Sequence, residues 1–179
     1  MNCQIDSERL WLTPFAEKDA DAAFPAMTPS LTRYMAFDLP ESQSDFEKVW
    51  REWLITGEEG ADYAFTIRSK HDGRFIGLAG LHDAREVRPE LGIWISESEH
   101  GHGYGFEAVQ AVARWCSSKG SPTAFRYPVA ELNQSSRRIA KRLGGTVVAF
   151  EVTPKYKSVI YEIPPVVDPG LMKARRFSS

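Results

Sequence analysis

The sequence predicts a single mixed α/β domain, in which one sheet carries helices on both faces. Strand-like segments dominate the first half of the chain, and a strand, turn, helix, strand, helix, strand, strand order fills the second half. The 179 residues suit one core, and neither an internal repeat nor a low-complexity linker divides them. We therefore expect one domain over residues 1–163 and a flexible, Pro-rich and then basic tail over residues 164–179.

Composition narrows the class of protein. Hydrophobic residues make up 42% and the net charge is −2, which is ordinary for a globular domain and argues against strong nucleic-acid binding. Cys3 and Cys116 form no disulfide framework, and no CxxC or HExxH motif predicts a metal. The first ten residues lack the apolar segment of a signal peptide, and no apolar run approaches the ~20 residues that span a membrane. A cytoplasmic location is thus the default expectation.

In the first half, apolar residues alternate with small or polar ones, or form short apolar runs, in four predicted strands. Asp72-Gly73 predicts a hairpin turn between the second and third of them. Gly77 and Gly80, in the third, leave room for close approach of another backbone. The four segments are Arg9–Phe15, Tyr63–Ile67, Phe75–His82 and Arg88–Ser96.

Two helices are predicted between the first and second strands. Glu17–Ala26 is Ala-rich and predicts a short helix, and the Pro-containing segment Thr28–Pro40 predicts a loop. Ser44 and Glu47 match a capping box, after which apolar residues repeat at helical spacing until Gly57. The aromatic residues of this helix are expected in the core, and Tyr34, Met35 and Phe37 of the loop are candidates to line the mouth of a binding site.

The second half carries two further helices and three strands. A helix follows the glycines of residues 101–105 and ends at Lys119-Gly120. A second amphipathic helix carries Ser136 and Leu143 and ends at Gly144-Gly145. The strands are Ala124–Ala130, Thr146–Val152 and Ser158–Ile163.

The glycine-rich turn carries the most chemical information. Gly101, Gly103 and Gly105 separate a strand from a helix, and glycine permits positive φ and close approach of a ligand. The first N–H groups of the helix have no intrahelical partner and, with the helix dipole, suit anionic oxygens such as a pyrophosphate. A P-loop is excluded because the turn ends in Gly-Phe-Glu, and a dinucleotide fold because the turn follows the fourth strand. A tight turn without a ligand is the alternative.

Several motifs in order make the chain resemble the GNAT acetyltransferases, and among them the branch of the RimJ and RimL ribosomal-protein N-acetyltransferases. The turn His100-Gly101-His102-Gly103-Tyr104-Gly105 resembles the family's Gln/Arg-x-x-Gly-x-Gly/Ala pattern. Ile76–Leu81, Leu91–Ile95, and Asn133–Ser136 with Lys141–Gly144 resemble further blocks of that branch. The resemblance covers residues 8–163, with His100 where Gln or Arg is usual and Gly145 where Phe is usual.

The resemblance implies a GNAT fold, with a mixed, mostly antiparallel sheet of about six to seven strands and about four helices. It implies transfer of an acetyl group from acetyl-CoA, without a metal, to a primary amine on a protein N-terminus or a small molecule. Backbone N–H of Ile95 or Ser96 would polarise the thioester, and amides of Ile95 and Glu97 would pair with the pantetheine arm. The pyrophosphate would lie against His100, Gly101, His102, Gly103, Tyr104, Gly105 and Phe106.

Two side chains are candidates for the chemistry. A lysine-like amine is neutral in only about one molecule in a thousand at pH 7, so a base is needed, and Glu90 holds a place similar to the family's catalytic glutamate. Alternatively, Glu90 faces solvent and pairs with Arg85 or Arg88. The tyrosine that many members use to protonate the leaving thiolate is absent, because Ala140 stands there, so the branch points to Ser136 instead.

Other assignments stay open at this level. Ser136 and Asn133 could simply cap a helix, although the resemblance places Asn133 at the pantetheine or the acceptor. The basic residues of the second helix are either a solvated face or a contact for the nucleotide 3′-phosphate; they are Arg137, Arg138, Lys141 and Arg142. The function could also be that of a catalytically weak acyl-CoA-binding sensor or partner module. The acceptor and the acyl chain are not specified, and a homodimer is expected by family analogy alone.

Overall fold

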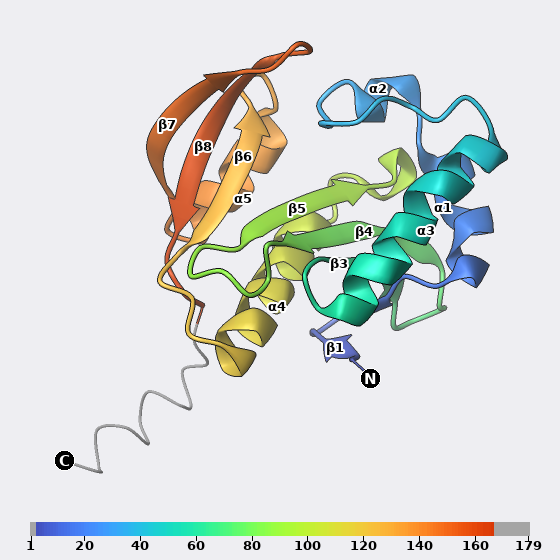
Figure 1. Ribbon diagram of the computed structural model, residues 1–179, viewed down its shortest axis with the longest axis horizontal. Helices are drawn as coiled ribbons and strands as arrows, with labels where there is room; N and C mark the ends of the chain where they lie inside the picture. The colour runs from blue at the N-terminus through green and yellow to red at the C-terminus, as the bar shows by residue number, and fades with distance from the viewer. Residues whose placement is uncertain (1–2, 167–179) are drawn as a thin grey trace.

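One eight-stranded sheet forms the centre of this computed structural model, which describes residues 3–166 (Figure 1). Neighbouring strands are antiparallel except β5 and β6, which are parallel. This confirms the mixed, mostly antiparallel sheet, whereas the predicted tail lies outside the described residues except for 164–166. In spatial order the strands are β1 (Ile5–Asp6), β2 (Leu10–Pro14), β3 (Tyr63–Ser69), β4 (Phe75–His82), β5 (Glu90–Ile95), β6 (Phe125–Ala130), β8 (Lys157–Ile163) and β7 (Thr146–Val152).

Helices cover both faces of the sheet because successive side chains of a strand point to opposite faces. On β5, Leu91 and Ile95 belong to the hydrophobic cluster that includes α4, while Trp94 belongs to the cluster that includes α1 and α3. Among the described residues no helix is long and apolar enough to cross a membrane. The helices are α1 (Ala20–Ala26), α2 (Pro29–Thr32), α3 (Gln43–Glu59), α4 (Tyr104–Lys119) and α5 (Gln134–Arg142), with 3-10 turns at Glu17–Asp19 and Glu97–Glu99.

The structure corrects both predicted ends of α3. Its N-cap is Ser42, whose hydroxyl accepts a hydrogen bond from the Asp45 N–H at 3.1 Å, so the Ser44 and Glu47 pattern lies inside the helix. The helix continues past Gly57 to Gly60, which has φ of +72° and therefore ends the helix in the left-handed conformation. Gly57 is tolerated within the helix because one glycine lowers helix stability by only about 1 kcal/mol.

Two short elements exceed the prediction. β1 has two residues and pairs with β2, which makes eight strands rather than six or seven. The predicted loop Thr28–Pro40 contains α2, because the Thr28 hydroxyl caps the Leu31 N–H and Pro29 stands at the first helical position. With α2 included, residues 3–166 contain five α-helices rather than about four. Neither element is long enough to show a periodic pattern in the sequence.

The parallel pairing of β5 with β6 ends almost where it begins. The register contains one pair, Glu90 with Arg126, and the Arg126 N–H donates to the Pro89 carbonyl at 2.9 Å. Alternation along β6 directs the nitrogen of Pro128 to the same side, but proline has no N–H to continue the ladder. On its other edge, by contrast, β5 pairs with β4 at every residue from Glu90 to Ile95. The strands β5 and β6 therefore separate beyond Arg126, which leaves an edge of β5 without a partner strand (Figure 1).

Glycine allows β4 to hold the far end of β5. A Cβ atom at Gly77 would lie 2.2 Å from the Trp94 carbonyl oxygen and 2.9 Å from the Cα of Ile95, so the predicted close approach of backbone is confirmed there. At Gly80 the space is taken by a side chain instead, since a Cβ would lie 2.9 Å from Nε2 of His82. Gly77 thus fixes the position of Ile95, the last residue of β5.

We expect Gly77→Ala to lower the free energy of unfolding by roughly 2–4 kcal/mol, because the added methyl group must displace the backbone of β5. Guanidinium denaturation followed by circular dichroism measures the change. Gly57→Ala, inside α3, is the matched control. Its Cβ would lie 3.6 Å from the Asp62 carbonyl oxygen, an ordinary contact distance, so the variant should leave stability unchanged or raise it by up to about 1 kcal/mol. Equal stability of the two variants would contradict the steric argument.

Candidate active site

The glycine-rich turn presents the N-terminus of α4 to solvent. Gly101 and Gly103 have φ of +83° and +79°, a region that other residues rarely adopt, and Gly103 is the N-cap of α4. A Cβ at Gly101 would meet no atom within 4 Å, so backbone conformation rather than crowding requires glycine there. The first N–H groups of this 16-residue helix lack intrahelical acceptors and create a positive local potential. The turn can therefore bind an anionic group.

The third glycine has a different role. A Cβ at Gly105 would lie 3.1 Å from Cδ1 of Ile139 on α5 and 3.6 Å from Cγ1 of Ile95 on β5. Gly105 therefore lets α4, α5 and the end of β5 pack closely. This contact brings the turn and the unpaired edge of β5 into one site.

A partly buried carboxylate anchors the turn to the N-terminal strands. Glu107 accepts hydrogen bonds of 2.7 Å each from the Ser7 hydroxyl, the Arg9 backbone N–H and the Arg9 guanidinium. Burial alone would raise its pKa, but these donors hold the pKa of Glu107 below its usual range. The Arg9 guanidinium also donates to the His102 carbonyl at 3.0 Å and lies 4.7 Å from the centre of the Tyr104 ring. Arg9 therefore fixes the backbone of the turn.

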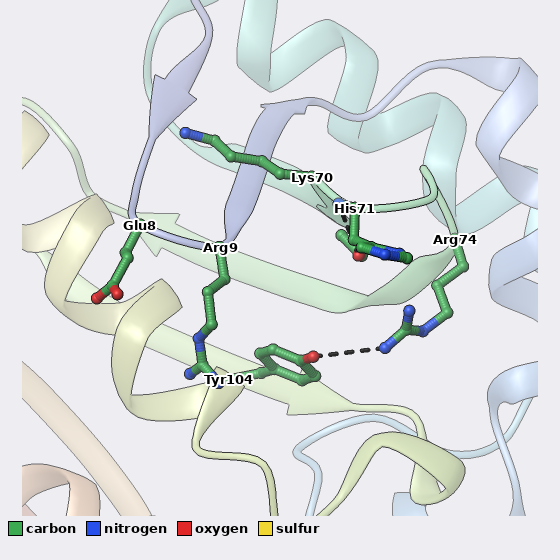
Figure 2. Close-up of a pocket in the computed structure, with 7 residues that line it drawn as sticks. Glu8, Arg9, Lys70, His71, Arg74 and Tyr104 are labelled. Carbon is green, nitrogen blue, oxygen red and sulfur yellow. Dashed lines mark hydrogen bonds between the residues drawn. The ribbon is translucent and has the colours of Figure 1, made fainter.

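Beside the turn is a cavity of about 340 Å³, lined by Arg9, Lys70, Arg74 and Tyr104 among others (Figure 2). Its cations are already paired: Arg9 with Glu107, Lys70 with Asp6 at 3.2 Å, and Arg74 with Asp72 and Glu99. We therefore assign no anion to this cavity. The Arg74 pairing instead holds the Glu99 carboxylate, with Nε at 3.0 Å from Oε1.

The end of β5 offers one backbone amide to the open edge. The Ser96 N–H donates to the Ile76 carbonyl of β4 at 2.8 Å, so it is already used within the sheet. Because N–H groups of successive residues point to opposite edges of a strand, the Ile95 N–H faces the β6 side. Of the two predicted oxyanion donors, Ile95 is therefore the one directed at the opening.

His100 contacts the same edge. Its Nε2 lies 2.7 Å from the Ile95 carbonyl oxygen, and since a carbonyl only accepts, Nε2 must carry the proton. Glu97, the other residue expected at the pantetheine, uses its carboxylate elsewhere: it accepts hydrogen bonds of 2.6 Å from the hydroxyls of Thr28 and Ser30. Those bonds lower the Glu97 pKa and tie the start of α2 to the end of β5.

Glu90 has a different partner from those predicted. It forms an ion pair with Arg126, the residue beside it in the parallel register, and Arg126 also binds both carboxylate oxygens of Glu151 at 2.9 Å. Arg85 and Arg88 do not take this role, since Arg85 donates to the Glu59 carbonyl and Arg88 lies 3.6 Å from Glu162.

Glu90 lies on the face of β5 that carries Trp94 and faces α3. Tyr156 stands nearby, and burial together with the Glu90 charge raises its pKa. The carboxylate is therefore a partly buried group within a small polar cluster, on the opposite face of the sheet from α4.

The N-terminus of α5 brings two further candidates to the site. Asn133 is the N-cap, and its Oδ1 accepts the Ser136 N–H at 3.1 Å. The Ser136 hydroxyl is therefore not the cap and lies 2.7 Å from the hydroxyl of Tyr127 on β6. The guanidinium of Arg142, later on α5, lies 3.7 Å from the centre of the Phe106 ring on α4, so one of the predicted basic residues borders the turn.

A rim closes the site on the α3 side. The Lys155 ammonium, in the turn between β7 and β8, lies 2.8 Å from the Phe37 carbonyl, 3.3 Å from the Thr32 carbonyl and 3.1 Å from Asp38. Figure 1 shows the α2 segment facing the tip of this hairpin. Residues 28–40, which the sequence proposed for the mouth of the site, therefore join β7 and β8 as its wall.

Four residues that sequence reasoning missed connect these parts: Arg9, Arg126, Tyr127 and Lys155. None belongs to a motif, and each contacts a partner that is distant in the sequence or lies on a different element. Within residues 3–166 no group of three or more His, Cys, Asp or Glu is placed to hold a metal.

Comparison with known proteins identifies the family of this site. Residues 9–146 match the acetyltransferase (GNAT) domain model. No curated protein sequence matches the chain. Three solved structures share the fold at low sequence identity. The first is the acetyltransferase of Salmonella typhimurium that modifies the N-terminal serine of L7/L12 (19% identity, TM-score 0.78, 93% of this chain and 100% of that one). The second is Mycobacterium smegmatis RimJ in complex with CoA-disulfide (15% identity, TM-score 0.80, 91% of this chain and 88% of that one). The third is the ribosomal-protein-S5-alanine acetyltransferase of Vibrio fischeri (10% identity, TM-score 0.79, 92% of this chain and 97% of that one).

We expect Glu107→Gln to lower the free energy of unfolding by about 1–2 kcal/mol at pH 7, because it weakens charge-assisted hydrogen bonds to Ser7 and Arg9. A carboxylate whose pKa is lowered by folding contributes stability above its unfolded pKa of about 4.3, and loses it as pH falls through the lower folded value. The gap between wild type and variant should therefore close below about pH 4.

Denaturation in guanidinium from pH 3 to pH 7 measures this gap. Glu58→Gln, at an exposed position on α3, is the control and should show little gap at any pH. A gap for Glu107→Gln that did not depend on pH would assign the loss to packing rather than to charge.

Proposed function

Because this chain belongs to the GNAT acetyltransferase family, we propose that it transfers an acetyl group from acetyl-CoA to a primary amine, and that the amine is a protein N-terminus or a small molecule. One observation carries the proposal: the glycine turn at the start of α4 lies directly beside the unpaired edge of β5. A pyrophosphate and an amide-containing arm need these two features side by side.

The described residues fit acetyl-CoA. Its pyrophosphate would accept hydrogen bonds from the first N–H groups of α4, after Gly103. Its pantetheine amides would pair with the open edge of β5, where the Ile95 carbonyl can accept once the His100 ring moves aside. Arg142, stacked on Phe106, is placed for a nucleotide phosphate or base.

The acetyl donor supplies an activated thioester, and this chain supplies the groups that act on it. The Ile95 N–H would donate to the thioester oxygen as negative charge develops there. The Ser136 hydroxyl would donate a hydrogen bond to the sulfur as the C–S bond breaks. Glu90 would accept the amine proton, directly or through water, as the C–N bond forms.

The ordinary pKa values of amines favour an acceptor that is easily deprotonated. Glu90 already pairs with Arg126, and an amine that is often neutral needs less help from a base. An α-amino group has a pKa of about 7.7–8.0, so roughly one molecule in ten is neutral at pH 7, against about one in a thousand for a lysine. An amine at a protein or peptide N-terminus therefore depends less on Glu90 to remove its proton. The acetyltransferases of similar fold that act on serine and alanine of ribosomal proteins agree with this choice.

We expect wild type to bind acetyl-CoA in calorimetry and Gly103→Ala to weaken binding by about tenfold or more, because the strained cap misplaces the N–H groups of α4. Gly60→Ala is the matched control, since Gly60 has a similar φ of +72° at the distant end of α3 and should leave affinity unchanged. Absence of wild-type binding at millimolar acetyl-CoA would refute the proposed function.

We expect acetylation of peptides that begin with Ser or Ala to exceed acetylation of lysine side chains at pH 7.

Glu90→Gln should lower kcat by about a hundredfold while the affinity for acetyl-CoA stays unchanged, because the variant cannot accept a proton. Liquid chromatography of the acetylated peptides measures both, and the exposed Glu86→Gln is the control. Binding of acetyl-CoA without turnover across peptides and small amines would instead identify an acyl-CoA-binding module.

A further inference from the structure

A buried tyrosine contacts the hydroxyl proposed to meet the sulfur. Tyr127 lies on β6, 1% of its surface is exposed, and its hydroxyl lies 2.7 Å from Oγ of Ser136. Within residues 3–166, Ser136 Oγ is the hydrogen-bond partner of this phenol. A buried hydroxyl needs such a partner. At this distance one of the two hydroxyls donates a hydrogen bond and the other accepts it.

The chemistry of the two groups decides which of them donates. Burial raises the pKa of Tyr127, so the phenol keeps its proton throughout the accessible pH range. A phenol is also a stronger donor than an alkyl hydroxyl, because its unperturbed pKa is about 10. The favoured arrangement is therefore Tyr127 O–H donating to Ser136 Oγ. The Ser136 proton is then directed elsewhere.

We propose that Tyr127 is a positioning residue, which holds the Ser136 hydroxyl with its hydrogen directed at the sulfur of coenzyme A. The proposal rests on the proposed function, since it needs coenzyme A in the site between β5 and β6. In the reaction the C–N bond forms, the C–S bond breaks and the sulfur leaves as a thiolate. The thiolate accepts a hydrogen bond from Ser136, and neither hydroxyl loses its proton. The amine proton goes to the base, and solvent protonates the thiolate after release.

This arrangement explains how the site can act without the tyrosine that many family members carry on α5. In this chain a buried alanine, Ala140, stands at that position. The phenol comes instead from the neighbouring strand and acts through the serine. Hydrogen bonds in such a chain polarise one another, so an O–H that accepts from a phenol is a better donor to an anion. Removal of the Tyr127 hydroxyl should therefore weaken the bond between Ser136 and the thiolate without removing Ser136.

The test measures the thiol pKa of bound coenzyme A, which needs no acceptor amine. Thiolate absorbance in the ultraviolet is titrated for coenzyme A bound to wild type, Tyr127→Phe, Ser136→Ala and the double variant. We expect wild type to hold the thiol pKa about one unit lower than Ser136→Ala does. Tyr127→Phe should remove a large part of this difference, and the double variant should match Ser136→Ala because the two hydroxyls act as one unit.

Tyr161→Phe is the matched control. Tyr161 pairs with Tyr127 in the register of β6 and β8 and is equally buried, but its hydroxyl accepts from Nε of Arg137 at 3.1 Å. This variant should leave the thiol pKa at the wild-type value. Unfolding curves identify any variant that fails to fold, in which case Ser136→Thr, which keeps a hydroxyl, should retain the wild-type pKa.

Each outcome decides the question. Binding of coenzyme A with the same thiol pKa in wild type and Tyr127→Phe would overturn the proposal and leave the proposed function standing. Equal changes in Tyr127→Phe and Tyr161→Phe would also overturn it, because they would reflect packing. Failure of wild type to bind coenzyme A would overturn both. A change confined to Tyr127→Phe and Ser136→Ala would establish the positioning role.

Discussion

The site depends on the single parallel pair between β5 and β6. Arg126 bonds to Pro89, and Pro128, two residues later, has no N–H with which to continue the ladder. The strands separate from that point, so the edge of β5 that faces β6 has no partner strand there. The glycine turn follows the end of this edge, and the helix that carries Ser136 follows the end of β6. The binding groups thus come together because one ladder stops early.

Strand alternation separates the two halves of the proposed reaction. Residues of β5 that face α4 pack the core beneath the turn, while Glu90 and Trp94 face α3. The Ile95 N–H lies between these faces, in the plane of the sheet. An acyl donor held at α4 and an amine held on the α3 side would therefore meet at the edge of β5 from opposite directions. This geometry would keep Glu90, the proposed base, apart from the phosphates of a bound acetyl-CoA.

Local features were predictable from the sequence, and contacts between distant segments were not. The turn of residues 101–105, the hairpin at Asp72-Gly73 and seven of the eight strands follow from short patterns, and the structure confirms them. The predicted N-terminus of α3 was wrong because Ser42 with Asp45 and Ser44 with Glu47 are both capping patterns, and the helix uses the first. The predicted C-terminus was wrong because Gly57 lies inside the helix, which ends at Gly60.

The partners of the functional groups depend on topology. Arg126 reaches Glu90 only because β6 lies parallel to β5, and Arg9 reaches Glu107 across 98 positions of sequence. The resemblance to a family located the individual residues, but it could not give these pairings. The roles of Glu90, Ser136 and Ile95 are proposals that the geometry supports.

The Lys155 contacts have a consequence for how such enzymes could be re-engineered. One side chain joins the α2 segment to the β7–β8 hairpin, although the two are more than a hundred residues apart. A graft that exchanged only residues 28–40 for a related sequence would break this joint and leave the hairpin without its support. The two segments therefore form one exchangeable unit, and chimeras designed to accept new amines should transplant them together.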